Sequence, residues 1–184
     1  MKPLVVYHDN CPDGFTAAWA IWCSVGDNAE YRAMNHGQPM PSAPSDYARR
    51  RVMFVDFSLP RNELLALIRY GARVEVYDHH KTAQADLEDL PGAKVVFDMH
   101  RSGAGIVWDE FRLTQRPALV SYVEDRDLWR WKLNDSRAVS EWLFSIPRTF
   151  AHWDEAAAEL ERDIAGVVRI GEAFLRLKRE RVAK

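Results

Sequence analysis

The segment VEVYDHHKTA, residues 74–83, joins a strand-like apolar run to an acid and two adjacent histidines. Valine and tyrosine favour a β-strand up to Tyr77. Each imidazole that leaves water needs partners for two ring nitrogens, so His79 and His80 bring little benefit to a packed core. We therefore interpret this segment as a strand that ends at a chemically active site.

The composition limits the class of protein. The chain has 184 residues, 47% hydrophobic and 28% charged, which suits one globular domain, alone or with a short appendage. Its formal net charge of −2 argues against a globally basic nucleic-acid-binding surface. Two cysteines, Cys11 and Cys23, imply no disulfide framework and favour a reducing cytoplasm. The start, KPLVVYHDN, turns polar early, so we expect neither a signal peptide nor a membrane span.

Strand and helix patterns alternate through the first two-thirds of the chain. Strands are expected within residues 3–7, 50–58, 72–80 and 93–98, and helices within residues 15–26, 60–71 and 102–113. This alternation predicts an α/β fold, a mostly parallel sheet with helices on both faces. Residues 154–184 are charged and predict one long C-terminal helical stretch. We expect one domain over residues 1–134 and a C-terminal helical extension, packed on it or leading away from it, over residues 135–184.

Acids and histidines follow several of the expected strands. In an open α/β sheet, ligands bind beyond the carboxyl ends of the strands. The apolar run ALVSYV, residues 118–123, also ends in acids. Imidazoles and carboxylates gathered at one edge suit Mn²⁺, Mg²⁺ or Zn²⁺, and two ions if a carboxylate bridges them. The side chains at this edge are His8, Asp9, Asp13, Asp56, Asp78, His79, His80, Asp125 and Asp127.

Four ordered motifs resemble those of the DHH phosphoesterase superfamily. They are YHDNCPDG (7–14), VDFS (55–58), YDHHK (77–81) and VEDRD (123–127). The superfamily includes single-strand DNA exonucleases, oligoribonucleases, cyclic-dinucleotide phosphodiesterases and family II pyrophosphatases. The resemblance covers about Val5 to Trp129, and SGAGIVWDEF, residues 102–111, resembles the helix after the DHH strand.

The resemblance implies a centre of two Mn²⁺ ions, with Mg²⁺ or another divalent ion as a substitute. It makes Asp13 a metal ligand, Asp56 the carboxylate that bridges the two ions, and His79 a ligand of one of them. Asp125 is expected as the last ligand, with Asp127 as its rival. Asp127 also fits an acid at a helix N-terminus, which we favour for it.

The first motif departs from the common pattern. Many members place two aspartates two residues apart before the glycine, where this chain has Cys11 and Asp13. A thiolate is softer than Mn²⁺ prefers, so we expect His8 and Asp9 to serve instead. Asp9 is about equally suited to capping its own loop.

A second set of residues is expected to act on the substrate. His80 would face the phosphate and donate a proton or hydrogen bond, Asp56 would hold the ions, and Asp78 would orient a histidine. Lys81, Arg101 and the free N–H groups at Ser102 and Gly103 would hold a neighbouring phosphate. We interpret the histidines outside the motifs, including His36, as loop residues. Whether they reach the substrate is left open. Trp129 and Trp131 are interpreted as packing anchors, with base stacking as the alternative.

These patterns predict a cytoplasmic, metal-dependent phosphoric ester hydrolase of phosphodiesterase or exonuclease type. A small nucleotide or short single-stranded oligonucleotide is the expected substrate. The alternatives are a phosphoanhydride hydrolase similar to pyrophosphatases and a non-catalytic nucleotide- or metal-binding module. The DHHA1-type domain that commonly follows in the superfamily is not recognisable here. We therefore expect a minimal DHH domain, a part of something longer, or a C-terminal helix that recruits a partner domain or a second copy as a homodimer. No membrane partner is expected.

Overall fold

The computed structural model describes residues 1–111 and 115–182, and the chain divides into two compact units, Met1–Leu113 and Thr114–Lys184. Within the described residues, the first unit contains a parallel sheet of five strands in the order β2-β1-β3-β4-β5. This confirms the α/β class. The strands are β1 (Leu4–His8), β2 (Glu30–Met34), β3 (Arg51–Val55), β4 (Arg73–Asp78) and β5 (Ala93–Phe97).

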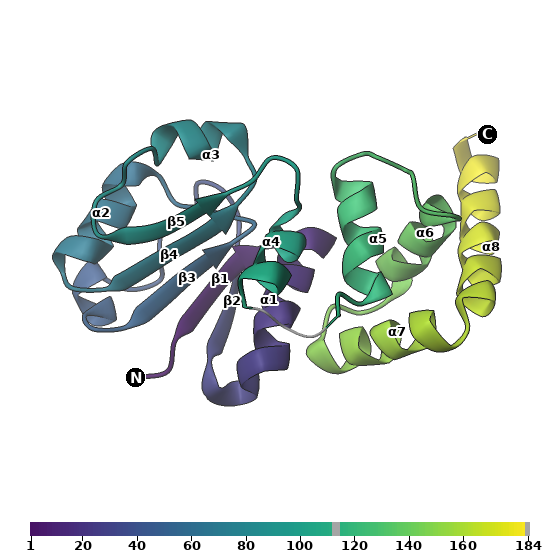
Figure 1. Ribbon diagram of the computed structural model, residues 1–184, viewed down its shortest axis with the longest axis horizontal. Helices are drawn as coiled ribbons and strands as arrows, with labels where there is room; N and C mark the ends of the chain where they lie inside the picture. The colour runs from purple at the N-terminus through teal and green to yellow at the C-terminus, as the bar shows by residue number, and fades with distance from the viewer. Residues whose placement is uncertain (112–114, 183–184) are drawn as a thin grey trace. The chain divides into compact units, whose positions relative to one another are not determined.

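Helices cover both faces of the sheet (Figure 1). Helices α1 and α4 pack against each other and against the central strands, whereas α2 packs on β4 from the other face. Successive side chains of β1 point to opposite faces of the sheet, where they meet different helices. Val6 belongs to the apolar cluster that contains Leu64 of α2. The ring of Tyr7 lies 5.8 Å from that of Phe15 in α1. The helices are α1 (Pro12–Val25), α2 (Arg61–Arg69), α3 (Lys81–Asp86) and α4 (Gly103–Glu110), with 3₁₀ turns at Gly26–Asn28 and Pro44–Tyr47.

The register aligns the carboxyl ends of three central strands. Tyr7 of β1 pairs with Val55 of β3, and Val55 pairs with Tyr77 of β4. The next residue along each strand is therefore His8, Asp56 or Asp78, side by side at one edge of the sheet. This edge is where the sequence places its acids and histidines.

Strand β2 was not expected from the sequence. Its residues, EYRAM, are mostly exposed or half-buried, because β2 is an edge strand. Such a strand carries no continuous apolar run to mark it. Its carboxyl end leads into residues 35–46, which include His36.

Helices are the only regular secondary structure among the described residues of the second unit. The run ALVSYV, grouped above with the strand ends, begins helix α5, which packs against α6 and α7. Residues 118–127 thus belong to this unit, although the expected domain boundary followed residue 134. The helices are α5 (Ala118–Asp127), α6 (Ser136–Ser145), α7 (Phe150–Arg162) and α8 (Ile164–Val182).

The expected single C-terminal helix is two helices. The backbone leaves helical geometry at Asp163 (φ −145°, ψ 66°), whose carboxylate accepts the N–H of Gly166 at 2.9 Å and so caps α8. Within the described parts of the chain, none of the helices combines the length and the apolar character needed to cross a bilayer.

Two tryptophans of the second unit give a stability test. Trp153 in α7 is 0% exposed, whereas Trp129 is 72% exposed. We expect Trp153→Ala to lower the free energy of unfolding by about 3–5 kcal/mol, through lost burial and a residual cavity. Trp129→Ala should change it by less than about 0.5 kcal/mol. Urea denaturation followed by circular dichroism measures both, and equal midpoints for the two variants would contradict the packing described.

Candidate metal centre

The buried carboxylate of Asp56 lies at the middle of the site. Asp56 follows β3, takes a left-handed backbone (φ 50°) and is 2% exposed. Its Oδ1 lies 3.1 Å from Nε2 of His79, and its Oδ2 lies 3.8 Å from Nδ1 of His8. Burial alone would favour the neutral acid, but the contacts with His79 and His8 outweigh it and lower the pKa of Asp56. The site therefore holds a carboxylate.

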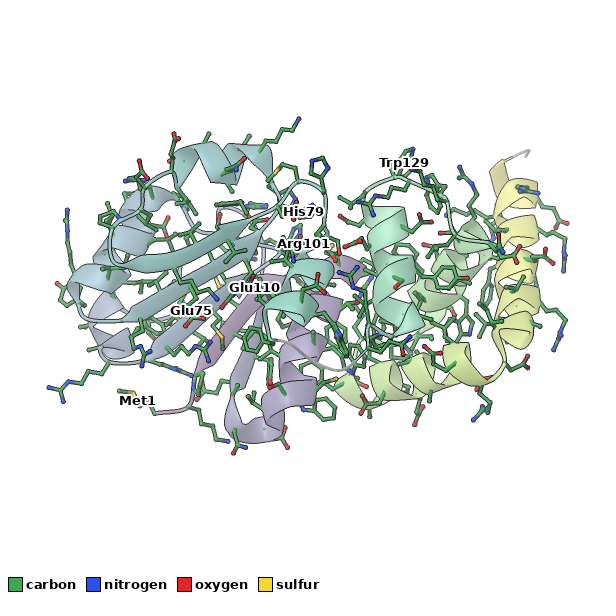
Figure 2. The ribbon with its side chains drawn as sticks, viewed as in Figure 1. Met1, Glu75, His79, Arg101, Glu110 and Trp129 are labelled. Carbon is green, nitrogen blue, oxygen red and sulfur yellow. The ribbon has the colours of Figure 1, made fainter. Side chains whose placement is uncertain are left out.

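Asp78 orients the DHH turn. Its Oδ1 accepts the backbone N–H of His79 at 2.7 Å and lies 2.6 Å from Nδ1 of His80. This contact raises the pKa of His80, although burial of the ring opposes the shift. Oδ2 of Asp78 is buried and has no hydrogen-bond partner among the described residues. A buried carboxylate oxygen without a donor is what a cation would satisfy. Figure 2 shows His79 just beyond the end of β4.

Asp13 ties the start of α1 to the start of α4. Its two oxygens accept the backbone N–H groups of Gly103 at 2.6 Å and Ala104 at 3.0 Å, and Oδ2 lies 3.6 Å from Nε2 of His79. A Cβ at position 103 would lie 2.5 Å from Cβ of Asp56 and 3.1 Å from Oδ2 of Asp13. Only glycine lets α4 begin this close to both acids. The two amides fix the direction of the Asp13 carboxylate, and its ligation of a metal stays a prediction.

Two groups of ligand atoms share Asp56. One group contains Asp56, Asp78, His79 and His80, and the other contains His8, Cys11 and Asp56. Within each group, one nitrogen, oxygen or sulfur atom per residue lies within 4.8 Å of the others. Oxygen and nitrogen donors at this spacing, together with the unsatisfied oxygen of Asp78, fit a divalent cation.

Asp9 belongs to neither of these groups among the described residues. Its Oδ1 accepts the N–H of Asn10 at 2.8 Å, and its Oδ2 lies 3.5 Å from Nδ2 of Asn35. The carboxylate is thus engaged with its own loop. Ligation by Asp9 stays a prediction.

Asp125 and Asp127 lie on α5 of the second unit, and Asp127 is the last residue of this helix, so the interpretation of Asp127 as a helix N-terminal acid is wrong. The carboxylate of Asp125 accepts the backbone N–H groups of Lys132 at 2.9 Å and Leu133 at 3.3 Å. Burial would raise its pKa, but the nearby Ser136 hydroxyl and the hydrogen bonds from these amides lower it. Asp125 therefore organises the segment after α5, and the choice between Asp125 and Asp127 as ligand stays open.

Most of the groups expected to bind phosphate contact other protein groups. Arg101 pairs with Asp98 at 2.7 Å and with Asp109 at 3.1 Å. Oγ of Ser102 accepts the N–H of Gly105 at 3.2 Å, and the N–H of Gly103 is bound to Asp13. Lys81, by contrast, is exposed at the first residue of α3. Phosphate binding by this set stays a prediction.

Two residues beside the site were underrated from sequence. Cys11 had been set aside as too soft, yet it lies with His8 and Asp56. The ring of His36 lies 5.2 Å from that of His8 and 6.4 Å from that of His80, and burial lowers the pKa of His36. His36 follows the end of β2, at the same edge of the sheet as the other imidazoles. A prediction of this strand would therefore have placed His36 near the site.

The first unit thus combines a parallel α/β sheet with a candidate divalent-metal centre at its carboxyl edge. No protein-family model matches the chain. The uncharacterized protein R106 of Acanthamoeba polyphaga mimivirus is 27% identical over 164 residues, which cover 82% of this chain and 39% of the viral protein. The chain therefore spans about two-fifths of the length of this relative.

Two solved structures have a similar fold. An uncharacterized protein from Helicobacter pylori G27 aligns with a TM-score of 0.57 and 14% identity, over 93% of this chain and 63% of that one. RecJ from Thermus thermophilus, crystallised with Mn²⁺, aligns with a TM-score of 0.51 and 18% identity, over 99% of this chain and 36% of that one. At these identities the likeness concerns the fold.

The contact between Asp78 and His80 predicts a measurable titration. In metal-free protein, we expect Asp78→Asn to lower the pKa of His80, because the imidazolium loses its carboxylate partner. The contact stabilises the fold fully below the unfolded histidine pKa of about 6.5, and this stabilisation is lost as the pH rises through the raised folded value.

Proton NMR of the His80 ring in chelator-treated protein measures this pKa. Asp46→Asn, at an exposed position on the turn Pro44–Tyr47, is the matched control. An unchanged His80 titration in Asp78→Asn would contradict the assigned contact.

Proposed function

We propose that this chain carries a DHH phosphoesterase domain, a divalent-metal-dependent phosphoesterase that hydrolyses short oligonucleotides or related nucleotide phosphodiesters. The observation that carries the proposal is Asp56, which belongs to both groups of ligand atoms. A carboxylate shared in this way is the element that holds two cations at a fixed separation. The RecJ-like fold and the order of the four sequence motifs support the same conclusion.

Asp56, Asp78 and His79 of the first group suit Mn²⁺, with Mg²⁺ as a substitute, and His80 lies beside them. Bound cations there would neutralise phosphate oxygens and lower the pKa of a water toward neutrality. Asp56 remains ionised because His8 and His79 compensate its burial. Asp78 holds His80 through Nδ1, which leaves Nε2 of His80 to face a phosphate oxygen.

His80 is assigned the role of donor to the substrate. Its pKa is raised by Asp78, so a larger fraction of its rings is protonated near neutral pH than for an unperturbed histidine. A protonated ring held at Nδ1 can donate from Nε2 to a non-bridging or leaving oxygen. Lys81, exposed at the start of α3, is the cation assigned to a neighbouring phosphate.

A small substrate fits the surroundings of the centre. A pocket of about 280 Å³ is lined by His36, Gln38, Phe57 and Thr82, and His36 also borders the imidazoles of the centre. This volume suits a nucleoside moiety more than a long strand. Arg101, the other basic side chain expected at phosphate, is paired with Asp98 and Asp109, so it would have to leave these partners to contact a polynucleotide.

Hydrolysis of bis-p-nitrophenyl phosphate tests the reaction class. We expect Mn²⁺-dependent release of nitrophenol that stops when a chelator removes the metal. Asp56→Asn should reduce the rate by roughly a hundredfold or more, because the neutral amide no longer holds two cations. Asp46→Asn should retain the wild-type rate. If no divalent metal supports turnover by the wild type, the chain is instead a non-catalytic binding module.

Substrate length tests the substrate class. We expect di- to tetranucleotides to be hydrolysed faster than single strands of several tens of nucleotides at equal concentrations of ends, because the pocket beside the centre has a volume of about 280 Å³. Rates over a length series in Mn²⁺, with pyrophosphate and cyclic dinucleotides alongside, measure the preference. Faster turnover of long strands would refute the assignment to short substrates, and faster turnover of pyrophosphate would favour the phosphoanhydride alternative.

A further inference from the structure

A thiol lies in one of the two groups of ligand atoms. Sγ of Cys11, a ring nitrogen of His8 and a carboxylate oxygen of Asp56 lie within 4.8 Å of one another. Cys11 is half-buried, and neither cysteine forms a disulfide. Cys23, on the same helix, is exposed and belongs to no such group among the described residues.

Local packing holds Cys11 against the end of β1. Cys11 is followed by Pro12 at the first helical position of α1, where proline suits the helix geometry. At Gly14, a Cβ would lie 2.6 Å from the carbonyl oxygen of His8 and 2.8 Å from its Cβ. Glycine therefore lets the first turn of α1 rest directly on His8 and brings Cys11 beside the imidazole.

The start of the helix does not explain a cysteine here. Ser, Thr, Asp and Asn are the preferred N-cap residues because their side-chain oxygens accept a backbone N–H. Cys11 occupies the N-cap position with extended backbone (φ −109°, ψ 124°), and its side chain makes no capping hydrogen bond. Capping of α1 therefore does not account for a cysteine at this position.

We propose that Sγ of Cys11 is a metal ligand and that it gives the two halves of the centre different metal preferences. Cys, His and Asp together are a donor set for borderline cations such as Zn²⁺ and Co²⁺. The group of Asp56, Asp78, His79 and His80 offers only oxygen and nitrogen and suits the harder Mn²⁺. The inference rests on the metal centre proposed above but requires no catalysis.

Binding through Cys11 involves no redox step. The thiol gives its proton to solvent, and the resulting thiolate donates an electron pair to the cation. His8 supplies a neutral ring nitrogen and Asp56 a carboxylate oxygen, so the site carries two negative charges from the protein against a divalent cation. The group that contains Asp56 and Asp78 also supplies two negative charges, so the two groups differ in the kind of donor atom and not in charge.

Cobalt spectroscopy tests the assignment without any activity measurement. Metal-free, reduced protein is titrated with Co²⁺ under anaerobic conditions. Wild type and the matched control Cys23→Ser should both develop the near-ultraviolet thiolate-to-Co²⁺ charge-transfer absorption. Cys11→Ser should lack this absorption but retain visible absorption from Co²⁺ held by nitrogen and oxygen. Because serine is a preferred N-cap, Cys11→Ser should fold, which circular dichroism verifies.

Metal competition gives a second readout. Loss of an outer-shell partner already lowers metal affinity by about 10- to 100-fold, so Cys11→Asp should lower the ratio of bound Zn²⁺ to Mn²⁺ by at least about tenfold relative to wild type. Elemental analysis after equilibration with both ions measures this ratio, and Cys23→Asp should leave it unchanged.

Three outcomes would overturn the inference. An equal charge-transfer band in Cys11→Ser would place the thiol–cobalt contact elsewhere. Co²⁺ binding by the wild type without that band would show a metal centre that excludes Cys11 and would leave the proposed function standing. If the wild type binds neither Co²⁺ nor Mn²⁺, the inference and the proposed function fail together.

Discussion

The buried charge of Asp56 is the constraint on which the first unit depends. An ionised carboxylate that is 2% exposed would be very costly without compensation. Compensation comes from His8 at the end of β1 and His79 after β4, the two strands that flank β3. The Asp56 carboxylate is therefore compensated only when β1, β3 and β4 pair in the observed parallel register. A slip of one residue in either pairing would move an imidazole to the other face of the sheet and leave the carboxylate unpaired.

A second buried carboxylate, Asp13, fixes the start of α4. The amides at the start of α4 carry partial positive charge, and two of them point at Asp13 beside Asp56. Gly103 permits this approach because a Cβ there would meet Asp56. The centre is thus held from one side by imidazoles and from the other by a helix N-terminus. Both devices stabilise negative charge before any cation binds, which favours an assembled site in the metal-free protein.

The sequence predicted the parts of the structure that leave a strong local pattern. The β-branched runs of β1, β3, β4 and β5 indicated the sheet, and the acids and histidines after them indicated most of the centre. Exposed β2 left no apolar run, so it and the His36 that follows it were missed. The run ALVSYV is short enough to suit strand or helix, and packing within the second unit made it helix α5. The end of α7 at Asp163 has neither Pro nor Gly to signal it.

The sequence of the first motif does not show which way its side chains point. Asp9 and Cys11 lie two residues apart in one loop, and softness alone favoured the aspartate. The backbone sets their directions: Asn10 takes a left-handed conformation (φ 54°), and its N–H is accepted by Asp9, which turns that carboxylate toward its own loop. Cys11 then leads into α1 and lies with His8 and Asp56. Donor chemistry alone could not predict which of the two side chains lies beside Asp56, because the path of the chain decides it.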